Sequence, residues 1–222
     1  MNNRISLHLS TSFALVILAM AQAVHCADLK LSGATYLGGP QADEASAVDI
    51  APDKSIVFAG KIHGGKFGKT PTELLGGGSG AVIRFDATGA EVLSATRIGD
   101  SVDDMEVNKS NGQIAIIGDF GAALLWPDAA GVFWHKKLSP AGGFVLVVSP
   151  DFSKRLLWTT FETDSYASTP KAIAAAAGAA VIASDAQKDA MVTLAAIQKE
   201  ANNPSKDSPD AYLAVWNTDG QR

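Results

Sequence analysis

The sequence AVDIAPDKSIVFAG (Ala47 to Gly60) recurs in outline twice further along the chain. The later copies are MEVNKSNGQIAIIG (Met105 to Gly118) and KAIAAAAGAAVIAS (Lys171 to Ser184). Each copy has a short apolar segment, then a turn containing Asp, Asn or Gly, then a second apolar run that ends in a small residue. Short apolar runs on both sides of such a turn predict a strand–turn–strand hairpin.

Two further kinds of segment repeat between these hairpins. The first kind is a strand that closes on a turn, and its copies are AVIRFDATG (Ala81 to Gly89), FVLVVSPDF (Phe144 to Phe152) and AYLAVWNTD (Ala211 to Asp219). The second kind follows that turn, and its copies are Leu29 to Gly38, Glu91 to Gly99 and Arg155 to Thr163. Four short strands in a unit of about 60 residues are typical of a β-propeller blade with one long connection.

The repeats therefore predict an all-β fold, a propeller-like array of four-stranded blades. They fall at about residues 34–99, 96–163 and 160–222, within a domain that spans 28–222. A β-sandwich is the alternative fold. Because propellers typically have four to eight blades, three repeats indicate either part of a longer propeller or two chains that together form a six-blade ring.

The two ends of this domain are expected to meet. The domain begins with Leu29 to Gly38, a segment of the second kind, and ends just after Ala211 to Asp219, a segment of the first kind. In a propeller, two such strands can pair in one blade, which closes the ring and removes exposed sheet edges. We therefore expect Leu29 to Gly38 to complete the last blade.

Part of the repeat resembles a known family. ATYLGGPQADEASAVDIAPDKSIVFAG (Ala34 to Gly60) resembles the bacterial SBBP-type β-propeller repeat, and GAVIRFDATG and DAYLAVWNTDG resemble the strand that follows in it. The resemblance covers most of residues 30–220 and is weakest in the third unit, where alanine replaces much of the pattern. It implies a propeller in a secreted or surface bacterial protein, with no single activity and no catalytic residues.

Residues 1–23 have the pattern of a signal peptide. Arg4 precedes the apolar run Phe13 to Ala21, which is well below the roughly 20 residues that a membrane-spanning helix needs. Ala21-Gln22-Ala23 then provides the small residues of a cleavage site, and cleavage after Ala27 is a second choice. The alternative is a buried helix that begins at Met1. We expect a secreted or periplasmic protein with no membrane span once this segment is removed.

Composition and motifs exclude several functions. The 222 residues are 47% hydrophobic and 18% charged, with a formal charge of −5 and one cysteine. These values exclude wholesale disorder, a nucleic-acid surface and a disulfide framework within the chain. No Gly-x-Ser-x-Gly, His-Glu-x-x-His or Cys-x-x-Cys motif occurs, so we favour a protein that is not an enzyme.

Acidic residues gather in the connections that join one unit to the next. They are Asp43, Glu44, Asp100, Asp103 and Asp104. Such oxygen ligands would suit Ca²⁺, and no other cofactor is expected. The alternative role is turn and cap chemistry on a solvated rim.

The connections inside the units are long, at 61–79, 119–142 and 185–209, and should leave the same face as those between units. The second carries Trp126, Trp134, His135 and Lys137. Aromatic rings beside cations suit a carbohydrate or protein ligand. The alternative role is an apolar plug that holds the connection on the propeller. In the third, residues 186–201 predict an amphipathic helix.

The sequence thus favours an exported propeller module that binds a partner or acts as a scaffold through its loop-rich face, without catalysis. A hydrolase or lyase that uses Asp103, Asp104 and Glu106 is one alternative. A structural fragment of a larger surface protein is another. A homodimer is the form that the two-chain ring would take.

Overall fold

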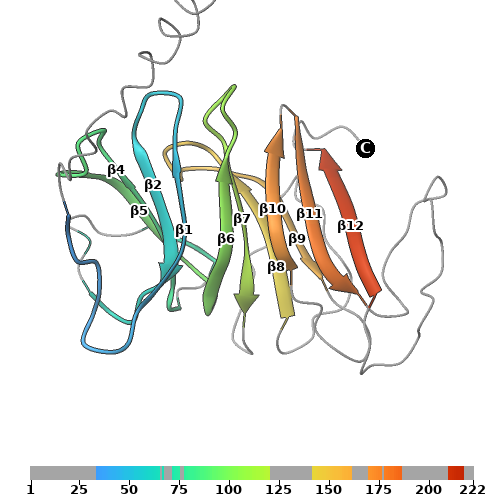
Figure 1. The fold of residues 1–222 in the computed structure, drawn as a ribbon, viewed down its shortest axis with the longest axis horizontal. Coiled ribbons are helices and arrows are strands. Elements are labelled where there is room, and N and C mark those ends of the chain that lie inside the picture. The colour runs from blue at the N-terminus through green and yellow to red at the C-terminus, as the bar shows by residue number, and fades with distance from the viewer. Residues whose placement is uncertain are drawn as a thin grey trace, which may run out of the picture. The chain divides into compact units, whose positions relative to one another are not determined.

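A computed structural model describes residues 34–65, 67, 72–75, 78–120, 142–161, 170–176, 178–186 and 210–217. The chain divides into two units, Met1–Ala34 and Thr35–Arg222, and every described strand belongs to the second. The described part of that unit contains strands and no helix, which confirms the all-β prediction (Figure 1). Among the described residues, no helix is long and apolar enough to cross a membrane.

The first sheet has the strand order β1-β2-β4-β5-β3. Its strands are β1 (Glu44–Ile50), β2 (Ile56–Lys61), β3 (Thr72–Leu75), β4 (Gly80–Phe85) and β5 (Val92–Ile98). Neighbouring strands are antiparallel, apart from β3, which runs parallel to β5. The long connection of the first unit thus contains a strand that the repeat pattern did not predict.

The second and third sheets are antiparallel and follow chain order. The second consists of β6 (Ser101–Val107), β7 (Ile114–Phe120), β8 (Gly142–Val148) and β9 (Arg155–Phe161). The third consists of β10 (Pro170–Ala176), β11 (Ala179–Ala186) and β12 (Asp210–Asn217). The three hairpins predicted from the repeated sequence are confirmed as β1–β2, β6–β7 and β10–β11.

Two predictions for the third unit lie partly or mostly outside the described residues. The segment Leu29 to Gly38 is expected to supply a fourth strand, yet its described residues, Ala34 to Gly38, form no strand. Leu37 instead packs against an apolar cluster on the first sheet. The helix predicted at 186–201 overlaps the end of β11 at Ala186, and the rest of that range lies outside the described residues.

The same β-bulge recurs in the first hairpin of every sheet. The register shifts between Ala45 and Ala47, between Val102 and Asp104, and between Pro170 and Ala172. Opposite the first two bulges lie Gly60 and Gly118. A Cβ on Gly60 would stand 2.1 Å from the carbonyl oxygen of Glu44, and one on Gly118 2.1 Å from that of Ser101. This close approach explains why these two copies of the hairpin end in glycine.

Two apolar clusters join the three sheets face to face. The cluster between the first and second sheets includes Val57, Ala59, Val82, Ile114, Ile116, Phe144, Leu146 and Trp158. The cluster between the second and third includes Ala115, Ile117, Val145, Val147, Leu157, Ile173, Ala180 and Ile182. The second sheet is therefore covered on both faces, as its continuous apolar strands suggest.

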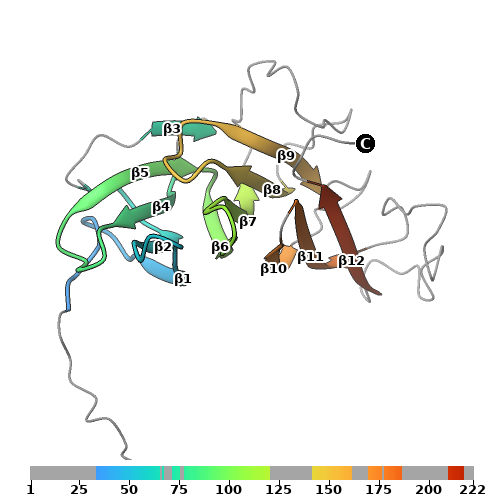
Figure 2. The same ribbon diagram turned by 90° about the horizontal axis from the view of Figure 1, so that it is seen from above.

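The first strands of the three sheets, β1, β6 and β10, lie beside one another in that order (Figure 2). Extensive strand contacts join the first sheet to the second and the second to the third. Within the described residues none joins the first to the third, so these sheets do not close into a ring. The repeated-sheet architecture is confirmed, whereas a closed propeller is not.

Candidate functional site

The connections into the first strand of a sheet and out of its second strand meet at one end of that sheet. Glu44 at the start of β1 faces Lys61 at the end of β2, and Ser101 faces Asp119 in the second sheet. We call this the loop end; its described connections are residues 34–43, 62–65, 67, 78–79 and 99–100. The prediction that these connections share one end is confirmed for the first two sheets.

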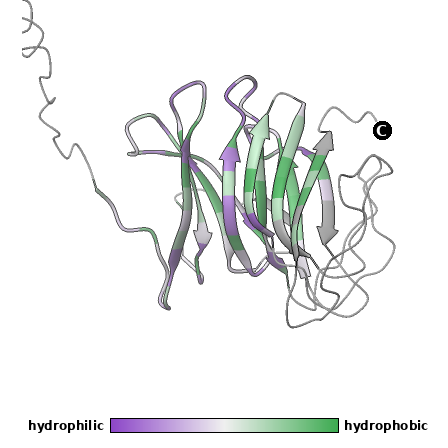
Figure 3. Ribbon diagram, turned by 45° about the vertical axis from the view of Figure 1, so that its right-hand side comes forward, coloured by the Kyte–Doolittle hydropathy of each residue, from purple (hydrophilic) through white to green (hydrophobic). Residues whose placement is uncertain are grey.

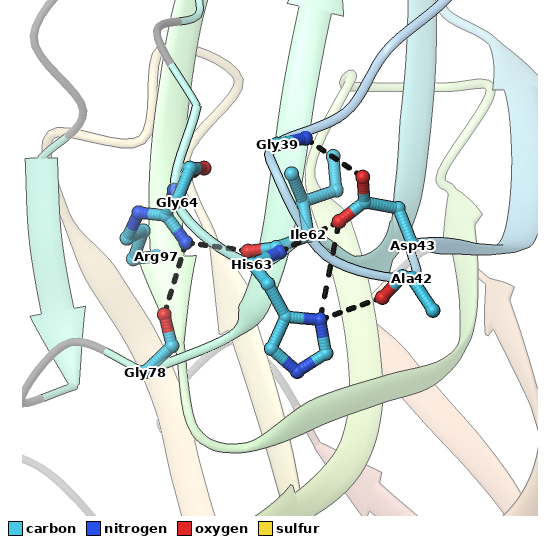
Figure 4. Close-up of polar contacts among 8 residues, drawn as sticks. All are labelled: Gly39, Ala42, Asp43, Ile62, His63, Gly64, Gly78 and Arg97. Atoms are coloured by element: carbon cyan, nitrogen blue, oxygen red, sulfur yellow. Dashed lines mark hydrogen bonds and ion pairs between the residues drawn. The ribbon is translucent and has the colours of Figure 1, made fainter.

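Asp43 ties two of these connections together (Figure 4). Its Oδ1 accepts a hydrogen bond from the backbone N–H of His63 at 2.8 Å, and its Oδ2 accepts one from Gly39 at 2.7 Å. His63 Nδ1 lies 2.7 Å from the carbonyl oxygen of Ala42 and 3.9 Å from Asp43 Oδ1. The N–H groups of His63 and Gly39 lower the pKa of Asp43. This carboxylate therefore orders backbone, as the alternative of cap chemistry predicts.

Arg97 on β5 holds the same connections from the other side (Figure 4). Its Nη1 donates to the carbonyl oxygens of Ile62 at 2.8 Å and Gly78 at 3.0 Å, and its Nη2 donates to that of Gly64. The guanidinium also lies 4.9 Å from the centroid of the Phe67 ring, a cation–π contact. No local sequence pattern points to this role of Arg97, because its partners are 19 to 35 residues away along the chain.

Replacing Arg97 with alanine is expected to lower the free energy of unfolding by about 2 kcal/mol, because three carbonyl groups lose a charged donor. Arg97→Lys should recover only part of this, since a lysine cannot reproduce the planar fork of donors. Denaturant unfolding measures the loss, and hydrogen exchange should quicken at the amides of residues 62–65. If Arg97→Ala matches the wild type in both measurements, Arg97 does not hold the loop end.

The other acids predicted as cation ligands lie at the start of β1, on β6 and in the turn before β6. Glu44 is the exposed first residue of β1, and Asp100 is exposed in the turn between β5 and β6. Asp103 is the extra residue of the β6 bulge and accepts a hydrogen bond from the Ser101 hydroxyl at 2.9 Å. In the described part of the chain, no group of three or more His, Cys, Asp or Glu residues could hold a metal ion.

Three carboxylates bridge from the first strand of one sheet to the first strand of the next, and we call them the bridging carboxylates. They are Asp49, which accepts from the backbone N–H of Val107 at 2.8 Å, Asp104, which accepts from Ile173 at 3.0 Å, and Glu106, which accepts from Ala175 at 2.8 Å. Asp49 pairs with Val57 in the first hairpin, and Glu106 pairs with Ala115 in the second, so the two acids occupy corresponding positions. The contact is thus repeated between successive sheets, and it occupies backbone donors on the edges of β6 and β10.

Asp119, near the end of β7, is a candidate that the sequence analysis missed. Burial raises the pKa of its carboxyl group, Asp103 and Asp100 raise it further, and Lys171 opposes them. These neighbours come from β6, the turn before it and β10, so no local motif could have gathered them. A carboxyl group with a raised pKa is a common feature of functional sites.

The aromatic and basic residues predicted to bind a ligand, Trp126, Trp134, His135 and Lys137, lie outside the described residues. No protein-family model matches the chain, and no curated protein matches it. A functional assignment therefore has to come from the geometry of the chain itself.

Proposed function

We propose that the chain is an exported, propeller-like repeat module that binds a protein or carbohydrate partner, or acts as a scaffold, through its loop end, without catalysis. The observation that carries this proposal is the order of the loop end in the first sheet. There Asp43 and Arg97 together bond five backbone groups of three connections. Ordered connections on a rigid β scaffold are the usual way in which such folds present a binding surface.

The bridging carboxylates also favour a role without catalysis. Asp104 and Glu106, two of the acids considered for a hydrolase or lyase, accept backbone N–H groups of the third sheet. A carboxylate occupied in this way has a structural task. The signal-peptide pattern at 1–23 supports export to the periplasm or the medium.

One observation favours the enzyme as a second candidate. Asp119 combines partial burial with a raised pKa beside Asp103 and Asp100, which is a property of general acids. Turnover of an ester, phosphate, peptide or glycoside substrate that is lost in Asp119→Asn would favour this alternative. Bound Ca²⁺ stays a prediction for the same acids, and a rise in melting temperature on adding Ca²⁺ would support it.

The binding proposal is tested with the mature chain on glycan and peptide arrays. A bound probe should lose at least about tenfold in affinity, or about 1.4 kcal/mol, in a Trp126→Ala/Trp134→Ala variant. Glu91→Ala is the matched control, because Glu91 lies in the β4–β5 turn at the opposite end of the first sheet. Equal loss in the control, or no binding to any probe, would overturn the proposal.

Export is tested by producing the full sequence in a Gram-negative host. The exported protein should begin near Val24 or Asp28 when its intact mass is measured. Protein that keeps Met1 would show that residues 1–23 are not a cleaved signal.

A further inference from the structure

The third sheet has an apolar face that is exposed in the described part of the chain. In the register of β10, β11 and β12, one face carries two rows, Ala174–Val181–Val215 and Ala172–Ala183–Leu213. We call this the trailing face. Leu213 and Val215 are 68% and 63% exposed. Figure 3, in which the third sheet comes forward, shows its strands coloured mostly as hydrophobic where they are described.

The corresponding positions are buried in the two sheets before it. Leu213, Val145 and Val82 occupy the same position in the third, second and first sheets. Each pairs with the corresponding residue of its neighbouring strand, which is Ala183, Ile117 or Ala59 respectively. Val82 and Val145 are fully buried, each under the sheet that follows. The chain therefore uses this face twice to stack one sheet on the next, and presents it a third time without a following sheet among the described residues.

The first sheet has an exposed apolar patch on the side that faces away from the second sheet. Val48 and Ile50 lie on its outer face, beside Phe58 and Ile56, and are 68% and 59% exposed. We call this the leading face. The residues at the same positions of the second sheet, Met105 and Val107, are buried against the first sheet. The leading face therefore carries apolar residues at the positions where the second sheet packs against the sheet before it.

The two faces also agree in their hydrogen bonding. Between sheets inside the chain, Asp49 and Glu106 accept a backbone N–H of the next sheet. At the leading face the corresponding N–H, that of Ile50, bonds instead to the adjacent Asp49 at 2.7 Å. At the trailing face the corresponding side chain is Ala174, which cannot accept a hydrogen bond. The leading face therefore has no free N–H at this position that needs an acceptor, and the trailing face has no side chain there to accept one. The two faces can pack together without leaving an unpaired polar group.

The residues before β1 resemble the end of a strand that has no sheet of its own. Ala34 to Gly38 reads ATYLG, and Ala95 to Gly99 at the end of β5 reads ATRIG. Leu37 packs against the cluster on the outer side of the first sheet, as Ile98 packs between the first and second sheets. Leu37 therefore lies where the fourth strand of a preceding sheet would end. In the described residues, β12 is a third strand with no fourth beside it.

We propose that two copies of the chain join head to tail. The trailing face of each covers the leading face of the other, and Ala34 to Gly38 of each pairs along β12 of the other, in the place of a fourth strand of its third sheet. One chain cannot make this contact in the described arrangement, because its first and third sheets lie on opposite faces of the second. Two copies supply six sheets, within the usual range of propellers, and a twofold axis makes both contacts identical.

The repeats set the register of the new pairing. In the first sheet Thr96 faces Val82. Thr35 corresponds to Thr96 in the shared sequence, and Leu213 corresponds to Val82 in the sheets. Thr35 of one copy should therefore face Leu213 of the other.

The first experiment measures the mass of the mature chain by sedimentation equilibrium. The expected mass is that of two chains, and Leu213→Asp/Val215→Asp should weaken association at least about 100-fold, or about 2.7 kcal/mol. Leu93→Asp is the matched control, because Leu93 is an exposed leucine on β5, which lies three strands away from β1 in the first sheet, and it should keep the dimer. A wild-type chain that stays monomeric, or a control that dissociates equally, overturns the proposal.

The second experiment tests strand exchange by disulfide formation in a Cys26→Ser background. A chain with Thr35→Cys is mixed with a chain carrying Leu213→Cys, and both are first checked for an unchanged melting temperature. A disulfide that forms in the mixture, and in neither chain alone, supports the proposal. With both substitutions in one chain, an internal disulfide in a monomer would show that the segment pairs with its own β12, which overturns the exchange. Absence of any disulfide in the mixture also overturns it.

Discussion

Replacing Trp158 with alanine is expected to lower the free energy of unfolding by about 3–5 kcal/mol, the usual loss for a large aromatic residue in a core. Trp158 is 2% exposed, within the cluster that joins the first two sheets. Its ring centroid lies 5.4 Å from that of Phe144, with 30° between the planes. Because alanine leaves a cavity between two sheets, the melting temperature should fall by about 10 °C. Denaturant and thermal unfolding measure both values.

Trp158→Phe is the control for this cavity, since it keeps a ring beside Phe144. It should cost less than half as much as the alanine variant, whereas Leu93→Ala on the surface should change the free energy of unfolding by less than about 0.5 kcal/mol. If Trp158→Ala loses less than 1 kcal/mol, roughly the average effect of any substitution, the first two sheets are not packed as the structure describes.

Removing two bridging carboxylates together is expected to have a comparable effect. Asp49→Ala and Glu106→Ala should each cost about 2 kcal/mol, because each leaves a backbone N–H of the next sheet without its charged acceptor. The two contacts lie in different interfaces, so the double variant should lose about 4 kcal/mol. Glu91→Ala, which removes an exposed acid, is the control. Strong non-additivity would mean that the two interfaces are coupled.

The cost of Asp49→Ala should also depend on pH. Burial acts to raise the pKa of Asp49, but hydrogen bonds from Lys109 and from the N–H groups of Val107 and Ile50 outweigh it, and the pKa lies below its ordinary value of 3.8. A carboxyl group with a lower pKa in the folded state adds stability above its unfolded-state pKa and loses it as pH falls through its folded-state pKa. The cost should therefore be full at neutral pH and shrink below about pH 4. An equal cost at both extremes would show that the charge of Asp49 contributes nothing.

The local parts of the fold were predictable because their causes are local. The hairpin Ala47 to Gly60 and its copies combine apolar runs with turn residues, and β1–β2, β6–β7 and β10–β11 form at those places. The turns depend on nearby atoms, as in the Asp53 carboxylate that accepts the Ser55 N–H at 3.1 Å. By contrast β3 was missed, because among the described strands it pairs only with β5, more than 20 residues further along the chain.

The sequence identified some residues of the candidate site but not the contacts that these residues make. Asp43 and Asp104 were identified as acids of the connections between units, yet each accepts backbone N–H groups. Arg97 and Asp119 had no local signal, because what defines them is the set of groups that stacking and pairing bring near. The bridging carboxylates likewise lie 58 to 69 residues from their partners along the chain, so no local pattern could predict these contacts.

The sequence by itself determined where most of the described strands and turns form and that one hairpin recurs three times, because backbone conformation and side-chain alternation are set by neighbouring residues. Only the tertiary structure decided which apolar faces are covered. Val82 and Leu213 occupy the same position in their sheets, yet one is buried and the other is exposed. It also decided whether a carboxylate points to solvent or to a backbone N–H of the next sheet. Both depend on which sheet stacks on which, and burial of apolar surface drives that stacking between residues far apart in the chain.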